Sequence, residues 1–211
     1  KYFKNYFIEE LKDNNLHWVG SSNQRVINVK ESLNKELVRP NGAIRYKGDT
    51  YLNLDVHRLK KNEPNKNRNE AEWFLVSEIA SAYGAIVKGI LNSVSENGKM
   101  SKPKKKLLEM ALNKQTEFIN RSYARITPKN MTKSNGYSCP AYKVPEAYEA
   151  VTTKRGIKYV PGAHPLTWGE SSLMKASDLF AENLKRQWHQ ITFRNGKHSR
   201  WSRRNFIRKY A

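Results

Sequence analysis

The sequence predicts a mainly α-helical protein with a small β component, and three observations support this prediction. Two long segments, 70–94 and 101–123, repeat apolar residues at the three- and four-residue spacing of a helix face. A third segment, 173–188, shows the same spacing. The stretch 43–56 alternates apolar and polar residues around a Lys-Gly-Asp turn, which is typical of a β-hairpin. We therefore expect an α+β fold built on a central hairpin of two long helices.

Residues 1–59 are predicted to form an N-terminal α/β segment. Aromatic residues four apart indicate an amphipathic helix over 2–12. A second short helix is expected from Asn28, a good N-cap residue, through Leu37. The β-hairpin follows, with arms at Ala43–Tyr46 and Thr50–Val56.

The stretch Lys60–Asn69 contains no apolar residue. We expect it to be either a linker between two domains or a loop within one continuous domain. The helical part, 70–211, starts with the long helix that Asn69 is expected to cap and that Asn97-Gly98 ends. Ser101 is the expected start of the next helix, with a proline in its first turn, and the two helices should form an antiparallel hairpin.

The rest of the chain is predicted to alternate loops with shorter elements. A short helix is expected over Pro145–Thr153 and a strand over Ile157–Val160. The third long helix, Leu173–Trp188, follows a Pro-Gly turn. A final basic helix is expected over Ser199–Tyr210.

The charge is the most informative feature for function. The chain has 39 Lys and Arg against 19 Asp and Glu, a net charge of +20, and a pI near 10.0. Self-repulsion at that charge opposes compaction, so an anionic partner is the simplest reason for it. Nucleic acid is the commonest such partner, because basic chains gain affinity by releasing its condensed counterions. The alternative is a highly charged surface that binds no ligand.

The densest positive segment is at the carboxyl-terminal end, where no acidic residue follows Glu182 and aromatic residues are interleaved. Arginine makes bidentate contacts with phosphate, and an aromatic side chain such as Trp201 stacks on a base or anchors the segment to the protein body. The alternative is a solvated basic tail. The residues predicted to contact nucleic acid here are Lys185, Arg186, Arg194, Lys197, Arg200, Trp201, Arg203, Arg204, Arg208 and Lys209.

A second basic cluster lies at the predicted start of the helix that begins near Ser101. Helix amino termini favour anions, so lysines there destabilise the free helix, and a bound phosphate would relieve this effect. The alternative is a charged helix start that faces solvent. The cluster consists of Lys102, Lys104, Lys105 and Lys106.

An enzymatic alternative depends on four carboxylates. Asp49, Asp55, Glu70 and Glu72 lie near one another in the sequence and close to lysines, an arrangement that could bind Mg²⁺ and cleave phosphodiesters. Their spacing matches no nuclease signature. The single cysteine excludes an internal disulfide and a multi-thiolate zinc site, and we expect no cofactor, no metal site and no small-molecule substrate.

No signal peptide or membrane span is evident, because Glu78 and Lys88 interrupt the most apolar stretch. We expect a location inside cells or within a virion. The abundance of Lys and Asn suggests an AT-rich coding genome, such as that of a bacteriophage or an organelle. The chain begins with Lys1, so we expect a fragment or a processed product.

These observations together predict a non-enzymatic protein that binds DNA or RNA through the phosphate backbone, with little sequence preference. It would be a structural component of a larger nucleoprotein assembly, such as a phage particle, another virion or a ribosome, and would contact other protein subunits there. Two alternatives remain open at this stage. One is a Mg²⁺-dependent nuclease, and the other is a viral structural or connector subunit that does not touch nucleic acid.

Overall fold

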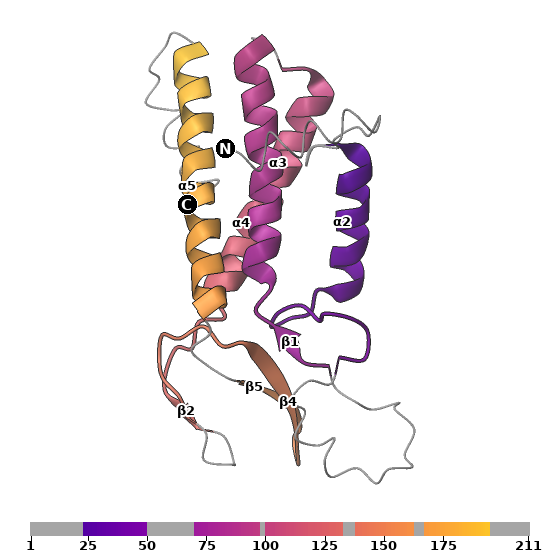
Figure 1. Ribbon diagram of the computed structural model, residues 1–211, viewed down its shortest axis with the longest axis vertical. Coiled ribbons are helices and arrows are strands. Elements are labelled where there is room, and N and C mark those ends of the chain that lie inside the picture. The colour runs from indigo at the N-terminus through magenta and orange to yellow at the C-terminus, as the bar shows by residue number, and fades with distance from the viewer. Residues whose placement is uncertain (1–22, 50–69, 98–99, 133–137, 163–166, 195–211) are drawn as a thin grey trace, which may run out of the picture.

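The computed structural model describes residues 23–49, 70–97, 100–132, 138–162 and 167–194. Long helices run side by side along the molecule, and a small sheet lies at one end of them (Figure 1). The prediction of a mainly α fold with a small β component is confirmed. The helices are α2 (Gln24–Leu37), α3 (Val76–Asn97), α4 (Lys102–Tyr123) and α5 (Thr167–Arg194).

The larger sheet has three antiparallel strands in the order β1-β4-β5. They are β1 (Glu72–Trp73), β4 (Ala147–Thr153) and β5 (Gly156–Pro161). A second, two-stranded sheet pairs β2 (Met131–Thr132) with β3 (Ser138–Cys139). No helix in the described part of the chain is both long and apolar enough to cross a membrane.

The helical hairpin of α3 and α4 forms the core, as predicted. The apolar seam expected on α3 is buried along its whole length, from Val76 to Val94. The Ser101 side chain caps α4 by accepting the backbone N–H of Lys104, as its position before Pro103 predicts. α5 packs its buried Leu173 and Ala176 against the same core.

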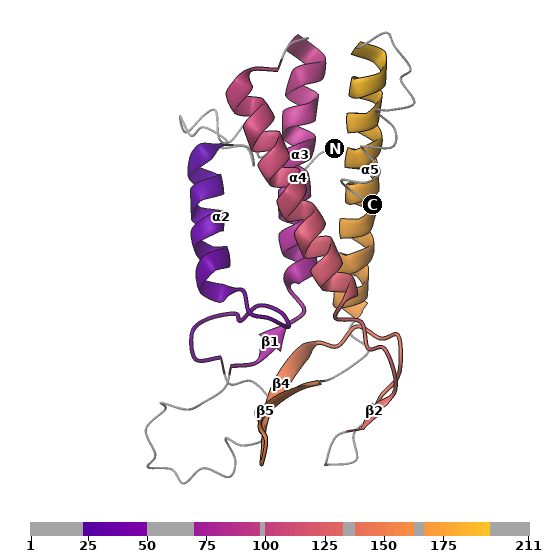
Figure 2. The same ribbon diagram turned by 180° about the vertical axis from the view of Figure 1, so that it is seen from behind.

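The direction of each helix follows from contacts at successive levels. The hydroxyls of Ser77 and Ser172 lie 2.7 Å apart near the starts of α3 and α5. Further along both helices, Asn183 Nδ2 donates to Gly84 O at 2.9 Å, and it also donates to Gln115 Oε1 of α4 at 3.2 Å. α3 and α5 are therefore parallel, and α4 runs against both (Figure 2).

Gly84 permits the close approach of α3 and α5. A Cβ at this position would lie 2.5 Å from Gln115 Nε2 and 2.7 Å from Leu179 Cδ2. Any larger side chain would force the helices apart. Gly84 therefore helps to fix the level at which α5 stands beside α3.

α2 stands apart from the bundle, beside α3 (Figures 1 and 2). Ile27 is its one buried residue and belongs to the main core. Polar contacts with Tyr83 hold α2 as well, because the Tyr83 hydroxyl donates to Glu31 and accepts from Asn34 Nδ2 at 2.9 Å. Lys30 Nζ lies 2.9 Å from the centroid of the Tyr83 ring.

The predicted strand at Ala43–Tyr46 is wrong. Within 43–46, Ala43 alone takes part in β pairing, through isolated bridges to Val38 and Trp73. Residues 45–48 form a turn. Ala43 is thus paired with Val38 and with Trp73 of β1. The other predicted hairpin arm, Thr50–Val56, and the stretch Lys60–Asn69 lie outside the described residues, as does the helix predicted over 2–12.

Two helix starts differ from the prediction, and each has a local cause. α2 begins at Gln24, because Asn23 caps it by accepting the N–H of Arg25 at 2.9 Å. Asn28 therefore lies inside the helix. α3 begins only at Val76, because the backbone of Trp73 is hydrogen-bonded to Ala43 in both directions and cannot enter a helix.

The helix predicted over Pro145–Thr153 is also wrong, since Ala147–Thr153 forms β4. Its aromatic and β-branched residues favour a strand, and pairing with β1 and β5 decides the outcome. The strand predicted over Ile157–Val160 is confirmed as part of β5. The third predicted helix is confirmed, although α5 is longer at both ends than 173–188.

Candidate nucleic-acid interface

The described residues of the two predicted basic clusters lie at the same end of the helical bundle, where α4 begins and α5 finishes (Figures 1 and 2). Contacts to the last turns of α3 fix this arrangement. Lys104 Nζ donates to Ser93 Oγ at 3.3 Å, and Arg186 Nη1 donates to Asn92 Oδ1 at 2.6 Å. We call this surface the basic bundle end; its residues are Lys102, Lys104, Lys105, Lys106, Lys185 and Arg186.

The four lysines on α4 and Lys185 are exposed. In the described part of the chain, none of these five side chains forms an ion pair with an acidic residue. Their charges face solvent and are open to an external anion.

Arg186 differs from the lysines because its charge is already used within the protein. Its Nη2 lies 2.6 Å from Glu182 Oε1, and Lys88 Nζ lies 3.2 Å from the other oxygen of the same carboxylate. The hydrogen bond from Lys88 lowers the pKa of Glu182, with Arg186 adding to the effect. Arg186 thus ties α5 to α3, and the available charge comes from the lysines.

The start of α4 adds a second attraction for anions. Its first turn contains no acidic residue, although acids there would stabilise the helix through its dipole. Lysines at this position repel the positive helix end. Phosphate bound there would meet both the ammonium groups and the positive end of the helix dipole.

The remaining predicted contacts lie at or beyond the end of α5. Arg194 is the last residue of α5, and the structure describes only its backbone. The sequence continues from this end of the bundle. The other predicted residues lie outside the described part and stay predictions: Lys197, Arg200, Trp201, Arg203, Arg204, Arg208 and Lys209.

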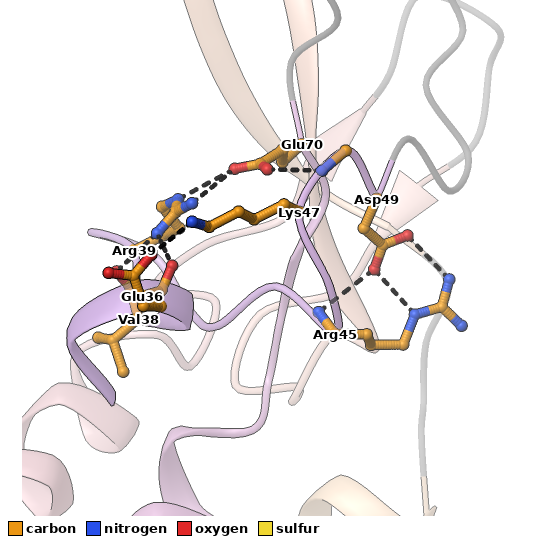
Figure 3. A network of polar contacts seen from close by, with 8 residues as sticks. Glu36, Val38, Arg39, Arg45, Lys47, Asp49 and Glu70 are labelled. Carbon is orange, nitrogen blue, oxygen red and sulfur yellow. Dashed lines mark hydrogen bonds and ion pairs between the residues drawn. The ribbon is translucent and has the colours of Figure 1, made fainter. Parts of the chain in front are cut away.

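The described acidic candidates lie at the opposite end, which we call the sheet end and define as the loop 39–49 with residue 70, β1, β4 and β5. Asp49 is fully buried and makes a two-pronged ion pair with Arg45, with N···O distances of 2.8 and 2.9 Å (Figure 3). Trp73 Nε1 donates to the same carboxylate at 2.8 Å, and its ring stacks under the Arg45 guanidinium, 4.0 Å away. Asp49 therefore closes the loop onto β1.

Glu70 and Glu72 are also engaged by donors from the protein. Arg39 Nη2 lies 2.9 Å from Glu70 Oε2, and Gly48 N donates to the other oxygen at 2.8 Å (Figure 3). The buried Glu72 carboxylate accepts the backbone N–H of Asn41. In the described ranges no group of three His, Cys, Asp or Glu side chains is placed to hold a metal ion, and Asp55 lies outside those ranges.

Burial at the sheet end also affects a tyrosine on β5. Loss of solvent raises the pKa of Tyr159 to about 12, and the nearby Glu72 carboxylate acts in the same direction, both by its charge and by a hydrogen bond. The phenol therefore stays protonated as a donor. Glu72 thus links the loop at Asn41 to β5.

Sequence reasoning missed the arginines that organise the sheet end. Arg121 donates to the backbone carbonyl of Arg39, and Arg125 Nη1 donates to Asn41 Oδ1 at 2.8 Å. Both lie on or just after the last turn of α4, more than eighty positions from their partners in the sequence. Among these arginines, Arg45 alone has a sheet-end carboxylate partner that is close in the sequence, because Asp49 lies four residues after it.

No protein-family model, no curated protein sequence and no solved structure matches this chain.

Proposed function

We propose that the protein binds nucleic acid through the phosphate backbone at the basic bundle end. The observation that supports the proposal is that the exposed lysines at the start of α4 and the exposed Lys185 near the end of α5, distant in the sequence, lie at the same end of the bundle. If each set of basic residues served only the solubility of its own helix, the two sets would not need to lie at the same end of the bundle. In the described part of the chain these lysines form no ion pair, so this end of the bundle offers several ammonium groups to a polyanion.

The contact would be electrostatic and largely independent of sequence. Each lysine that neutralises a phosphate releases condensed counterions, and this release drives binding. Lysine acts as a point charge without the planar geometry that reads a base edge. Phosphate contacts set position without reading sequence, so we expect similar affinity for unrelated sequences.

The direct test is an anisotropy titration of the full chain with labelled duplex DNA, duplex RNA and single strands at several salt concentrations. The proposal predicts binding at low salt and a linear fall of log K with log salt. The absence of binding to every probe at low salt would overturn it. The ranking of the probes identifies the preferred nucleic acid.

We further propose that this contact serves an assembly, such as a virion or a ribosome, and not catalysis. The carboxylates of the sheet end that the structure describes are held by arginine, tryptophan and backbone donors, which supports a structural use for them. Plasmid and ribosomal RNA incubated with the protein and Mg²⁺ should therefore stay intact. Cleavage that EDTA abolishes would instead favour a metal-dependent nuclease.

A further inference from the structure

The gap between α2 and α3 holds an apolar groove of about 510 Å³. Its walls come from one side of α2 and from the start of α3. The lining residues that matter most are Val26, Val29, Leu33, Leu37, Leu75 and Ile79. The groove lies on the side of the bundle, and its lining includes no residue of the basic bundle end.

The apolar residues on the α2 side of the groove are unusually exposed for their residue types. Val29 is 61% exposed, Leu33 is 53% exposed and Val26 is 37% exposed. Their spacing of three and four places them on one ridge of the helix. Leaving this ridge in water costs hydrophobic free energy, and contiguous exposed apolar patches in folded proteins usually mark a contact surface.

The sequence contains a segment that fits this surface, directly before α2. Phe3, Phe7 and Leu11 are each four residues apart, so a helix over 2–12 presents them as one apolar stripe. Such a helix of 11 residues is about 16 Å long at 1.5 Å per residue. The α2 residues that line the groove, from Val26 to Leu37, span about 16 Å by the same rise.

The connection between residues 2–12 and α2 is long enough to reach along the groove and short enough to favour docking within one chain. Residues 13–22 join the segment to Asn23, the N-cap of α2, and ten extended residues reach about 33 Å. This reach exceeds the length of the groove. Short connections between helices favour antiparallel neighbours, and a short tether gives an effective concentration of about millimolar, which favours the chain's own segment over a second copy.

We propose that residues 2–12 of the same chain dock in the groove between α2 and α3 as a helix antiparallel to α2. Phe3, Phe7 and Leu11 fill the groove and cover Val29 and Leu33. α2 then has neighbours on both sides, since its contacts to Tyr83 hold the other side. This inference does not depend on the proposed binding of nucleic acid.

Thiol accessibility in the full chain tests the docking. Leu33→Cys puts a thiol on the covered ridge, and Met174→Cys puts one at a control position on α5 that is 68% exposed. The native Cys139 is buried and sets the background rate in wild type. The proposal predicts that Leu33→Cys reacts with a thiol reagent at least about tenfold more slowly than Met174→Cys, because reaction requires access.

A second pair of substitutions identifies the cover. Adding Phe3→Ser and Phe7→Ser should raise the rate at Leu33→Cys to that of Met174→Cys, and should leave Met174→Cys unchanged. Equal rates at the two thiols with the native N-terminal segment would overturn the proposal. So would protection that survives Phe3→Ser and Phe7→Ser.

The choice between the same chain and a second copy needs a covalent readout. Phe7→Cys combined with Leu33→Cys should form a disulfide on mild oxidation that migrates as a monomer on a non-reducing gel. A covalent dimer, or thiol protection that increases with protein concentration, would overturn the proposal in favour of a second copy.

Discussion

The two ends of the molecule use charge in opposite ways. At the sheet end, carboxylates are buried and held by donors from the protein, as Asp49 is by Arg45 and Trp73. At the basic bundle end, Lys102, Lys105 and Lys185 are exposed, with no ion pair in the described part of the chain. The net charge of +20 is therefore not evenly available to a partner.

The residue types differ in the same way. The sheet end relies on arginine, whose planar fork makes two-pronged bonds such as those of Arg45 with Asp49. The bundle end relies on lysine, a hydrated point charge that costs little to leave in water. Arginine at the sheet end holds the fold, whereas the lysines of the basic bundle end leave their charges in water.

The largest effect on stability is expected from Asp49→Asn. The change removes the buried charge and with it the two-pronged ion pair to Arg45. Because the Arg45 side chain is 40% exposed, water compensates in part, and we expect a loss of about 3 kcal/mol, the low end for a broken buried pair.

Urea denaturation followed by circular dichroism measures this loss. Glu36→Gln is the matched control, since it also removes one carboxylate but from an exposed pair with Lys47. Exposed pairs contribute little, so the control should unfold close to wild type. Equal unfolding midpoints for the two variants would contradict the structural role of Asp49.

Gly84→Ala should have the next largest effect. The added methyl meets Gln115 and Leu179 at less than contact distance, and overpacking of this kind costs about 1–3 kcal/mol. Thermal unfolding should show a lower Tm than in wild type. Asn113→Ala, at an exposed position on α4, is the control. If Gly84→Ala matches the control, then α3 and α5 are not packed as closely as we describe.

Lys30 is half-buried, and its buried Nζ has no hydrogen-bond partner within the described residues. Burial lowers the pKa of Lys30 from 10.5 to about 7, although Glu31 opposes the shift. Between these two values the unfolded chain binds more protons than the folded one. The free energy of unfolding should therefore rise with pH from about 7 upward.

Urea midpoints between pH 7 and about 9.5 measure this rise, below the range in which the raised pKa values of the buried tyrosines begin to favour unfolding. Lys30→Met should flatten the profile, because methionine keeps the apolar stem and removes the titrating amine. Parallel profiles for wild type and variant would show that Lys30 does not titrate in this range.

The smallest effect on stability is expected at the basic bundle end. Replacing Lys102, Lys105 and Lys106 together by Gln removes charges that repel the positive end of the α4 dipole. The variant should be as stable as wild type or slightly more stable by Tm. A clear loss of stability would mean that these lysines form contacts that hold the fold.

Local patterns predicted the helices well, because their information lies within a few turns. The seam of α3 and the Ser101 cap of α4 follow from spacing and from one side chain. β4 was predicted as a helix because its strand pairing comes from β1, far away in the sequence. Long-range pairing also explains why Trp73 belongs to a strand and not to the start of α3.

The candidate site, too, could be predicted from the sequence only in part. The basic clusters could be named from composition, but their meeting at one end depends on the directions of α4 and α5. Glu70 was recognised as a candidate carboxylate, whereas its partner Arg39 lies 31 residues away and gives no sequence signal. Spacing alone therefore could not separate carboxylates that hold the fold from carboxylates that hold a metal.

The most direct test of the central claim compares two triple variants in binding to duplex DNA as salt is varied. One replaces Lys102, Lys105 and Lys106 by Gln; the other replaces the exposed Lys129, Lys158 and Lys175, away from the basic bundle end. Both lose three charges, so net charge is matched. We predict that only the first variant makes the negative slope of log K against log salt less steep, by up to about 2.7 for three lost phosphate contacts. Equal slopes for the two variants would contradict it.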